Sequence, residues 1–196
     1  MRDHDYRRLI KSFAAAAAMS ASLYCAAWAD TSADGGQSAV WAQKEFRFIY
    51  QGFTTKYSCD GLRGKMRQIL LQFGARKEDL KVYDYGCSSP SGRPDIFPGV
   101  SVKMSVLVPA DSAAARQGAP VLPSHWQPVR LKLDNSSLDE AGECELIEQV
   151  KHKVLPLFTS RNVDLQNFCV PHQLSPGGTH LVADVLMPDQ VQASAR

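Results

Sequence analysis

An internal repeat constrains the fold of this chain more than any other feature of its sequence. Five residues recur 85 positions apart (144 − 59): Cys59, Phe73, Arg76, Asp79 and Leu80 return as Cys144, Phe158, Arg161, Asp164 and Leu165. Further along, Gly99 and Pro109 return 79 positions later (178 − 99) as Gly178 and Pro188. The six-residue difference falls in the loop around a second cysteine, Cys87 in one copy and Cys169 in the other. Such a repeat predicts one supersecondary unit used twice.

The first copy has the pattern strand–helix–strand–strand. Alternation of apolar and polar residues predicts strands over 45–53, 79–85 and 100–106. Between the first two strands, an apolar stripe predicts a helix that begins at Ser58 or Asp60. The stripe consists of Leu62, Met66, Ile69, Leu70 and Phe73. A half-buried sheet with one amphipathic helix packed on it follows from this pattern.

The second copy repeats that order with weaker signals. Alternation predicts strands over 128–134, 163–168 and 179–187. The helix between the first two of them is expected to begin with a capping box made by Ser137 and Glu140. We therefore predict the same four elements in both halves.

The predicted fold class is α+β, with two pseudo-symmetric βαββ repeats that form a mainly antiparallel sheet. The halves are 30–109 and 126–196, joined by a linker over 110–125, and residues 30–42 are expected to be a flexible leader. Because each predicted helix has one apolar face, both helices pack on one face of the sheet. The other face is then left to solvent, to a partner or to a groove.

The duplicated strand–helix–strand–strand arrangement resembles the architecture of gyrase-inhibitor-like small-molecule binders and of SOUL-type haem-binding proteins. The segments 57–63 (YSCDGLR) and 80–82 (LKV) resemble exported proteobacterial proteins that have no assigned function. The first resemblance concerns architecture and implies no activity, because one fold hosts many functions. The second implies an exported protein. We expect no cofactor.

The first 29 residues have the pattern of an export signal. Arg7, Arg8 and Lys11 precede an alanine-rich apolar run, and Ala27-Trp28-Ala29 fits a cleavage site. A membrane anchor is the alternative, but the run is short for a bilayer span of about 20 residues. We expect cleavage, no stable membrane anchor afterwards, and a periplasmic or secreted bacterial protein.

Four cysteines remain in the expected mature chain, which indicates two disulfides and allows three pairings. A duplicated unit would inherit pairing within each half. This predicts Cys59–Cys87 and Cys144–Cys169, each closing a loop for which chain entropy suggests roughly 3–4 kcal/mol. Free or metal-bound thiols are the alternative.

Charge and motifs exclude several function classes. The expected mature chain carries 18 basic and 18 acidic residues (22 − 4 and 20 − 2), whereas a nucleic-acid partner would favour a positive balance. Cys144, His152, Cys169 and His172 form a possible zinc set, but the first copy has no matching histidine, so we expect no metal. Nucleophile and cofactor motifs are also absent from the sequence. We therefore expect no catalytic residues.

Two groups of residues are candidates for binding. Arg76, Asp79, Arg161 and Asp164 recur in both copies, either to fix the turn between helix and strand or to make two equivalent ligand contacts. The aromatic residues Tyr83, Tyr85 and Trp126 are expected on the sheet face without helices, which suits a binding surface. Alternatively they form a second small core or contact the linker.

These observations predict a disulfide-stabilised, non-catalytic binding or envelope-structural module that engages a protein partner. A small-ligand binder that uses the cleft between the halves is the alternative, and a hydrolase has the least support. An apolar pocket between the halves would favour the ligand, and a flat aromatic face would favour the protein.

Overall fold

A computed structural model describes residues 36–89, 93–115, 118–131, 143–167, 170 and 179–189, all within the compact unit Ser32–Arg196. The expected export signal, the expected capping box of Ser137 and Glu140, and Cys169 and His172 lie outside the described residues. No helix among the described residues is long and apolar enough to cross a membrane.

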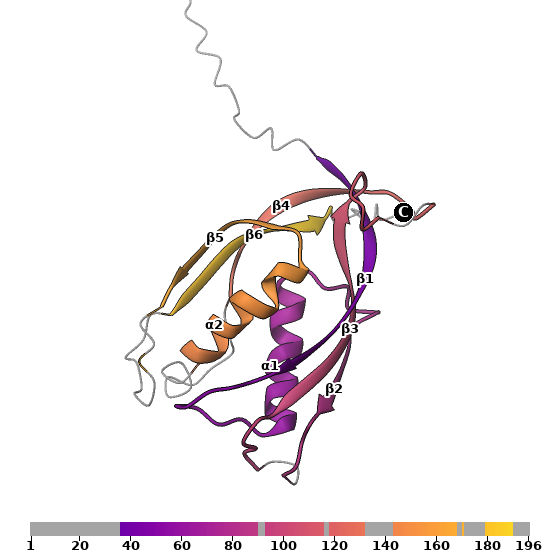
Figure 1. Ribbon diagram of the computed structural model, residues 1–196. Helices are drawn as coiled ribbons and strands as arrows, with labels where there is room; N and C mark the ends of the chain where they lie inside the picture. Colours follow the sequence, from indigo (N-terminus) through magenta and orange to yellow (C-terminus); the bar gives the residue numbers. More distant parts are fainter. Residues whose placement is uncertain are drawn as a thin grey trace, which may run out of the picture. The chain divides into compact units, whose positions relative to one another are not determined.

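Six strands of the described chain form one antiparallel sheet in the order β2-β3-β1-β4-β6-β5 (Figure 1). Their bounds are Gln37–Ile49 (β1), Lys81–Tyr85 (β2), Gly99–Pro109 (β3), Leu122–Arg130 (β4), Ser160–Gln166 (β5) and His180–Pro188 (β6). Each half contributes three strands, and the first strand of each half lies at the middle of the sheet. The predicted α+β class is confirmed. A common origin of the two halves stays a prediction.

One α-helix follows the first strand of each half. Helix α1 spans Cys59–Gln72, and α2 spans Cys144–Lys153. The predicted cap of α1 is present, because the Ser58 hydroxyl accepts a hydrogen bond from the backbone N–H of Gly61 at 3.2 Å. A short 3₁₀ helix, η2 (Leu155–Leu157), follows α2 and contains Pro156. Proline lacks the N–H that a continuing α-helix would need, so α2 ends before it.

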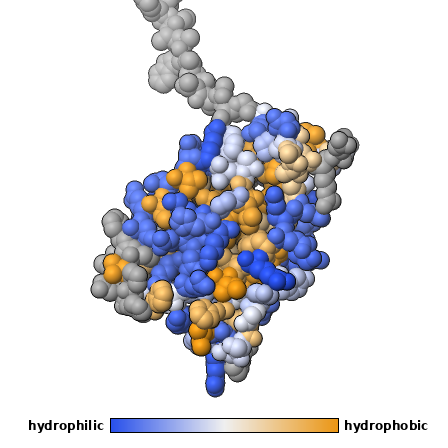
Figure 2. All heavy atoms as spheres, in the orientation of Figure 1, coloured by the Kyte–Doolittle hydropathy of each residue, from blue (hydrophilic) through white to orange (hydrophobic). Residues whose placement is uncertain are grey.

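Both helices pack on the same face of the sheet and share one core with it (Figure 1). The predicted stripe of α1 lies at the centre of this core, with no exposed surface on Leu62, Met66, Ile69, Leu70 or Phe73. Each such side chain contributes roughly 1.5–3 kcal/mol of burial free energy. Phe73 and its repeat counterpart Phe158 contact each other, with ring centroids 5.6 Å apart. Figure 2 shows hydrophobic residues in the middle of the displayed face and at its lower end, among hydrophilic ones.

The two halves of the sheet meet along a short seam. β1 pairs with β4 only at Gln37↔Ser124, Ser38↔Pro123 and Ala39↔Leu122. In contrast, β1 pairs with β3 from Ala39 to Ile49. The backbone ladder is therefore long within each half and short between them, and the continuous side-chain core supplies most of the cohesion between the halves.

Several predicted boundaries differ from the observed ones. β1 begins at Gln37, so residues 37–42 form a strand rather than a leader. β4 begins at Leu122, inside the predicted linker. The sequence does not predict a strand over residues 37–42, because the buried residues there include Ala39 and Ala42. These small side chains contribute little to an alternating apolar pattern. Pairing with β3 accounts for the strand conformation of this segment better than its local strand propensity does.

Candidate functional site

The sheet has one face without helices, which we call the outer face. Along β1, Val40 and Ala42 point into the core shared with the helices, so Ala39 and Trp41 point to the outer face. Strand register extends this assignment to neighbouring strands: Trp41 lies opposite Leu107 on β3, and Trp126 lies opposite Leu186 on β6.

A second small core occupies the centre of the outer face. Ala39, Leu107 and Leu186 are buried there, and Trp41, Leu122 and Trp126 pack against them while remaining half-buried. The cluster lies on both sides of the β1–β4 seam. Trp126 therefore occupies the small core that the sequence offered as one alternative, and its partly exposed ring forms part of the surface.

An arginine stacks on each tryptophan of this cluster. The Arg76 guanidinium lies 5.6 Å from the ring centroid of Trp41. The Arg161 guanidinium lies 4.4 Å from the ring centroid of Trp126. Both distances fall within the range of cation–π attraction. We call these the first and second Trp–Arg pairs.

The first Trp–Arg pair is held by the turn between α1 and β2. Asp79 donates its backbone N–H to the Arg76 carbonyl at 3.2 Å, and its carboxylate lies 3.7 Å from the Arg76 guanidinium. The Asp79 carboxylate also accepts a hydrogen bond of 2.7 Å from the Ser105 hydroxyl on β3. In this half, the predicted pair Arg76 and Asp79 fixes a turn and also positions a cation over an aromatic ring.

The second Trp–Arg pair is held differently. The structure places Arg161 and Asp164 within β5, on either side of a register shift, rather than in a turn. Arg161 lies 3.5 Å from the Asp184 carboxylate on β6, which also accepts a 2.7 Å hydrogen bond from Asn162. Asn162 has a φ of 52°, a left-handed conformation that asparagine tolerates better than most residues.

Equivalent residues build both pairs. Trp41 and Trp126 are 85 positions apart (126 − 41), as are Arg76 and Arg161 (161 − 76). The sequence indicated the arginines and Trp126 as candidates, but it did not join the tryptophans to the arginines. The shared offset of 85 positions is the sequence feature that could have joined the four residues. It becomes meaningful only once the register places all four side chains on one face.

Tyr83 and Tyr85 also lie on the outer face, but far from Trp126. Tyr85 aligns with Gly99 and, through it, with Ile49 at the end of β1, whereas Ser124 on β4 aligns with Gln37 at its start. Twelve residues of β1 (49 − 37) span about 40 Å. The predicted set of Tyr83, Tyr85 and Trp126 therefore does not form one site.

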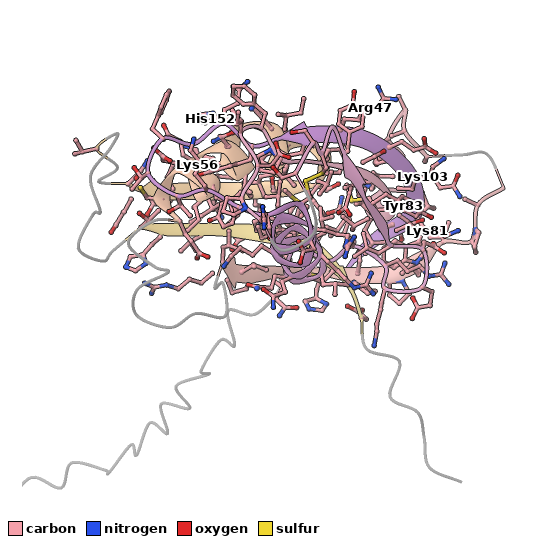
Figure 3. All side chains as sticks on the ribbon, turned by 90° about the horizontal axis from the view of Figure 1, so that it is seen from below. Arg47, Lys56, Lys81, Tyr83, Lys103 and His152 are labelled. Atoms are coloured by element: carbon pink, nitrogen blue, oxygen red, sulfur yellow. A yellow bond between two sulfur atoms is a disulfide. The ribbon has the colours of Figure 1, made fainter. Side chains whose placement is uncertain are left out.

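Cationic side chains surround the two tyrosines. Arg47 stacks on Tyr85 at 4.7 Å from its ring centroid and donates to its hydroxyl at 3.4 Å. Tyr83 is exposed, and Figure 3 shows it beside Lys81 and Lys103. A hollow of about 250 Å³ lies next to them, and its lining residues are Gln43, Lys44, Glu45, Glu78, Asp79, Lys81, Lys103, Met104 and Ser105. The lining contains three lysines and three acids, so its balance of charge favours a ligand of neither sign.

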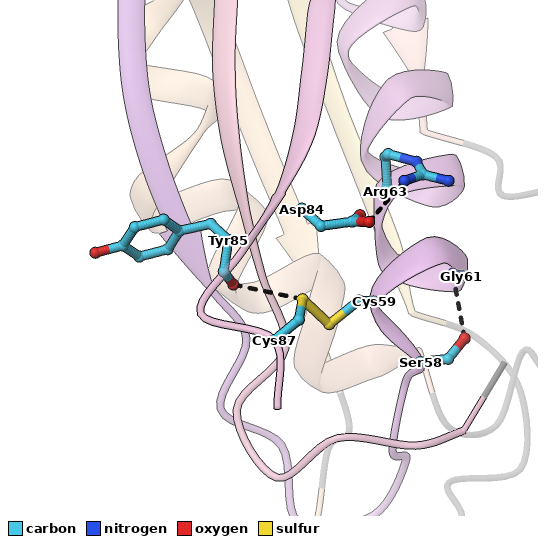
Figure 4. Close-up of polar contacts among 7 residues, drawn as sticks. All are labelled: Ser58, Cys59, Gly61, Arg63, Asp84, Tyr85 and Cys87. Carbon is cyan, nitrogen blue, oxygen red and sulfur yellow. Dashed lines mark hydrogen bonds and ion pairs between the residues drawn. A yellow bond between two sulfur atoms is a disulfide. The ribbon is translucent and has the colours of Figure 1, made fainter. Parts of the chain in front are cut away.

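The loop after Tyr85 is tied to the start of α1. The predicted Cys59–Cys87 disulfide is confirmed, with a Cα–Cα distance of 6.2 Å (Figure 4). Beside it, Arg63 on α1 pairs with Asp84 on β2 at 2.7 Å. Cys144 is also disulfide-bonded. Its predicted pairing with Cys169 stays a prediction.

Two features bear on metal binding and acid–base chemistry among the described residues. The described residues contain no group of three or more His, Cys, Asp and Glu side chains placed to hold a metal ion, and His152 is exposed on α2. Buried Glu145 accepts hydrogen bonds from the Tyr50 hydroxyl at 3.2 Å and from the Phe53 and Thr54 amides. Burial and this carboxylate raise the pKa of Tyr50, so its phenol stays protonated as a donor.

Comparison with protein-family models, with curated proteins and with solved structures found no match. The chemistry of the outer face therefore has to be judged from its own residues. Its centre combines buried aliphatic side chains, two half-buried tryptophans and two stacked arginines. Tryptophan and arginine are the residue types most enriched at the energetic centres of protein–protein interfaces.

Proposed function

We propose that this protein is an exported, non-catalytic binding module that engages a protein partner through the centre of its outer face. The observation that carries this proposal is the repeated Trp–Arg pair around one apolar cluster. A partner would cover the exposed parts of both indole rings and contact the arginines around them. The expected energetic core is aromatic and the expected rim is charged, as in stable protein interfaces.

The ion pairs around the tryptophans favour this role. Arg76 and Arg161 are each held by a carboxylate, so they are already oriented before a partner arrives. Preorganised side chains lose less conformational entropy on binding than free ones do. The outer face therefore offers two arginines that are each oriented over an indole ring.

The alternative function, a small ligand held between the halves, has less support. Phe73 and Phe158 meet between α1 and the β5 side of the molecule, within a core that includes residues of both halves. This aromatic contact occupies part of the space between the halves on the helix side. A flat surface with aromatic residues fits a protein better than a small molecule.

The compartment is part of the proposal. The Cys59–Cys87 disulfide is compatible with an oxidising location outside the cytoplasm, where such bonds persist. Together with the N-terminal export pattern, it favours a periplasmic or secreted protein. The natural partner would then be another exported protein or an envelope protein.

Position-specific photo-crosslinking tests the proposed function. A photoreactive phenylalanine analogue is placed at Trp126 in the full chain, and a control chain carries it at His152, which is exposed on α2. Both chains are expressed in a bacterium and crosslinked in intact cells. We expect a defined protein adduct from the outer face and none from the helix side.

The captured partner is then purified and titrated against variants. Trp126→Ala and Arg161→Ala are each expected to weaken its binding by about tenfold or more, the effect typical of an interface hot spot. Val121→Ser changes an exposed apolar residue outside the cluster and should leave binding unchanged. Equal adducts from both faces, or unchanged affinity in both cluster variants, would show that the outer face is not the binding site.

A further inference from the structure

A second exposed surface lies at the end of β1 opposite the seam. It consists of four apolar side chains, Ile49, Phe53, Ile96 and Phe97, which are 40%, 62%, 70% and 57% exposed. We call it the apolar tip. It contains half of the eight large hydrophobic side chains that are exposed among the described residues. Single exposed apolar residues are ordinary on a protein surface, but a concentration at one place indicates an interaction site.

Backbone pairing brings the two loops of the tip together. The loop after β1 and the loop before β3 join where the Asp95 N–H bonds to the Tyr57 carbonyl and the Tyr50 N–H bonds to the Pro98 carbonyl, both at 2.9 Å. Directly next to the bond between Asp95 and Tyr57, Ser58 and Pro94 form an isolated bridge. Phe53 therefore belongs to the same end of the molecule as Ile96 and Phe97.

A buried carboxylate holds each loop in place. Asp95 accepts hydrogen bonds from the Ser88, Ser89 and Phe97 amides at 2.8, 2.7 and 3.3 Å. Glu145 accepts them from the Phe53 and Thr54 amides at 2.9 and 3.1 Å. The amides of both phenylalanines are thus fixed, while their side chains point to solvent. Because the backbone of both loops is held by these hydrogen bonds, the exposure of the apolar side chains does not result from local unfolding of the loops.

The charge around the tip is positive. Lys56 and Arg93 are exposed on the same two loops, and Arg47 lies near the end of β1. Figure 3 looks at the molecule from below and shows Lys56 on one side and Arg47 on the other. Among the nearby acids, Asp95 and Glu145 are buried, Asp84 pairs with Arg63, and Asp60 in the first turn of α1 is partly buried. The tip therefore combines apolar side chains with cations.

We propose that the apolar tip docks reversibly on a lipid bilayer with anionic headgroups. Phe53, Ile96 and Phe97 would enter the boundary between headgroups and acyl chains, and Lys56 and Arg93 would meet lipid phosphates. Apolar side chains flanked by cations are the pattern of interfacial membrane binding. Each basic residue near an anionic surface adds attraction that salt weakens. The apolar tip is separate from the Trp–Arg pairs, so a docked protein keeps its outer face open to a partner.

Vesicle co-sedimentation tests this proposal, with protein produced from the full chain so that every variant has the same N-terminus. Vesicles of phosphatidylcholine are compared with vesicles in which about a third of the lipid is phosphatidylglycerol. We expect at least about tenfold stronger binding to the anionic vesicles, and a loss of that preference as salt is raised. The double variant Ile96→Ser/Phe97→Ser should bind at least about tenfold more weakly.

Matched variants complete the experiment. Val121→Ser alters a side chain that is 61% exposed outside the tip and should bind vesicles like the unaltered protein. Lys56→Glu/Arg93→Glu should lose the preference for anionic lipid, whereas Lys77→Glu, exposed near the end of α1, should retain it. Near-ultraviolet circular dichroism confirms that each variant is folded.

Two results would overturn the proposal. One is an unaltered protein that does not bind anionic vesicles, and the other is equal binding by the Ile96→Ser/Phe97→Ser variant. Trp126→Ala should keep full vesicle binding, so failure of the lipid proposal is distinguishable from failure of the protein-partner proposal. A protein adduct formed from a photoreactive group at Phe97, without vesicle binding, would assign the tip to a protein instead.

Discussion

The two halves of this molecule share one order of elements but differ in how firmly each is built. In the first half, β1 pairs with β3 over eleven positions, α1 spans 14 residues and has a side-chain cap, and a disulfide within that half ties its start to the loop after β2. In the second half, β4 pairs with β6 over seven positions, and α2, which begins at the disulfide-bonded Cys144, spans 10 residues before η2. β5 carries a register shift. The same order of elements therefore accommodates ladders and helices of different lengths when both halves share one core.

The largest expected effect comes from the contact between the halves. Phe73→Ala and Phe158→Ala should each reduce the free energy of unfolding by about 3–5 kcal/mol, because each leaves a cavity in the shared core. Urea unfolding followed by fluorescence and by circular dichroism measures the loss. We expect a single transition in both variants. A separate early transition in Phe158→Ala would mean that the second half unfolds alone and that the core is not cooperative.

The next largest effect concerns the disulfide. Cys59→Ala/Cys87→Ala should lower stability by about 3–4 kcal/mol, because the bond closes a loop with a sequence separation of 28. Reduction of the unaltered protein should give a similar shift of its unfolding midpoint. A decrease of less than about 1 kcal/mol in the free energy of unfolding would show that this disulfide contributes little to the stability of the first half.

The first helix allows a paired test of opposite sign. Ser58→Ala removes the cap and should cost about 1 kcal/mol. Gly64→Ala should stabilise by about 0.5–1 kcal/mol, because the site is exposed within α1 and a Cβ there meets no other atom within 4 Å. Thermal melting of both variants and of the double variant measures the two changes. A destabilising Gly64→Ala would indicate that this glycine serves close packing.

The two Trp–Arg pairs should differ by a smaller amount. Arg161 lies closer to its tryptophan than Arg76 does, 4.4 Å against 5.6 Å. Double-mutant cycles with Trp→Leu and Arg→Met are expected to give about 0.5–1 kcal/mol for the second pair and less for the first. Equal coupling energies in both cycles would remove this distinction between the halves.

The smallest effect on global stability should come from the loop that carries Phe97. Backbone hydrogen bonds from Ser89 and Ser88 hold the pKa of Asp95 well below its usual range. A depressed folded pKa means that the carboxylate stabilises the loop above the unfolded value of about 3.9 and that this contribution fades as pH falls below it. The protection factors of the Ser88 and Ser89 amides, which compare their exchange with the intrinsic rate at each pH, should therefore fall on acidification. Asp95→Asn should give low protection factors at every pH, and strong protection in that variant would contradict the assignment.

Much of the first half could be predicted from sequence, because its signals are local. The stripe of α1, its cap at Ser58 and the alternation of β3 follow from spacing alone. β4 is harder to predict from sequence, because Pro123 and Pro128 are unfavourable within a strand. Beyond Ser124, however, no described residue pairs with β4 on its β1 side, so a missing N–H at Pro128 breaks no described ladder there.

The candidate sites were less predictable, because they depend on non-local pairing. Trp41 and Arg76 carry a clear repeat signal, but only the register of β1 and β3 shows that they share a face. The apolar tip has no sequence pattern at all. Ile96 and Phe97 lie in a turn-rich segment, and their exposure depends on how Asp95 and Glu145 hold two separate loops.

The seam between β1 and β4 has a mechanical consequence. Three residue pairs join the two halves of the sheet among the described residues, so we expect bending between the halves to occur there rather than within either half. A small rotation about Ser38 and Pro123 would change the angle between the two tryptophan rings while both long ladders stay intact. A partner that contacts both tryptophan rings at once would restrict this rotation. Its binding should therefore reduce the relative motion of the two halves of the sheet.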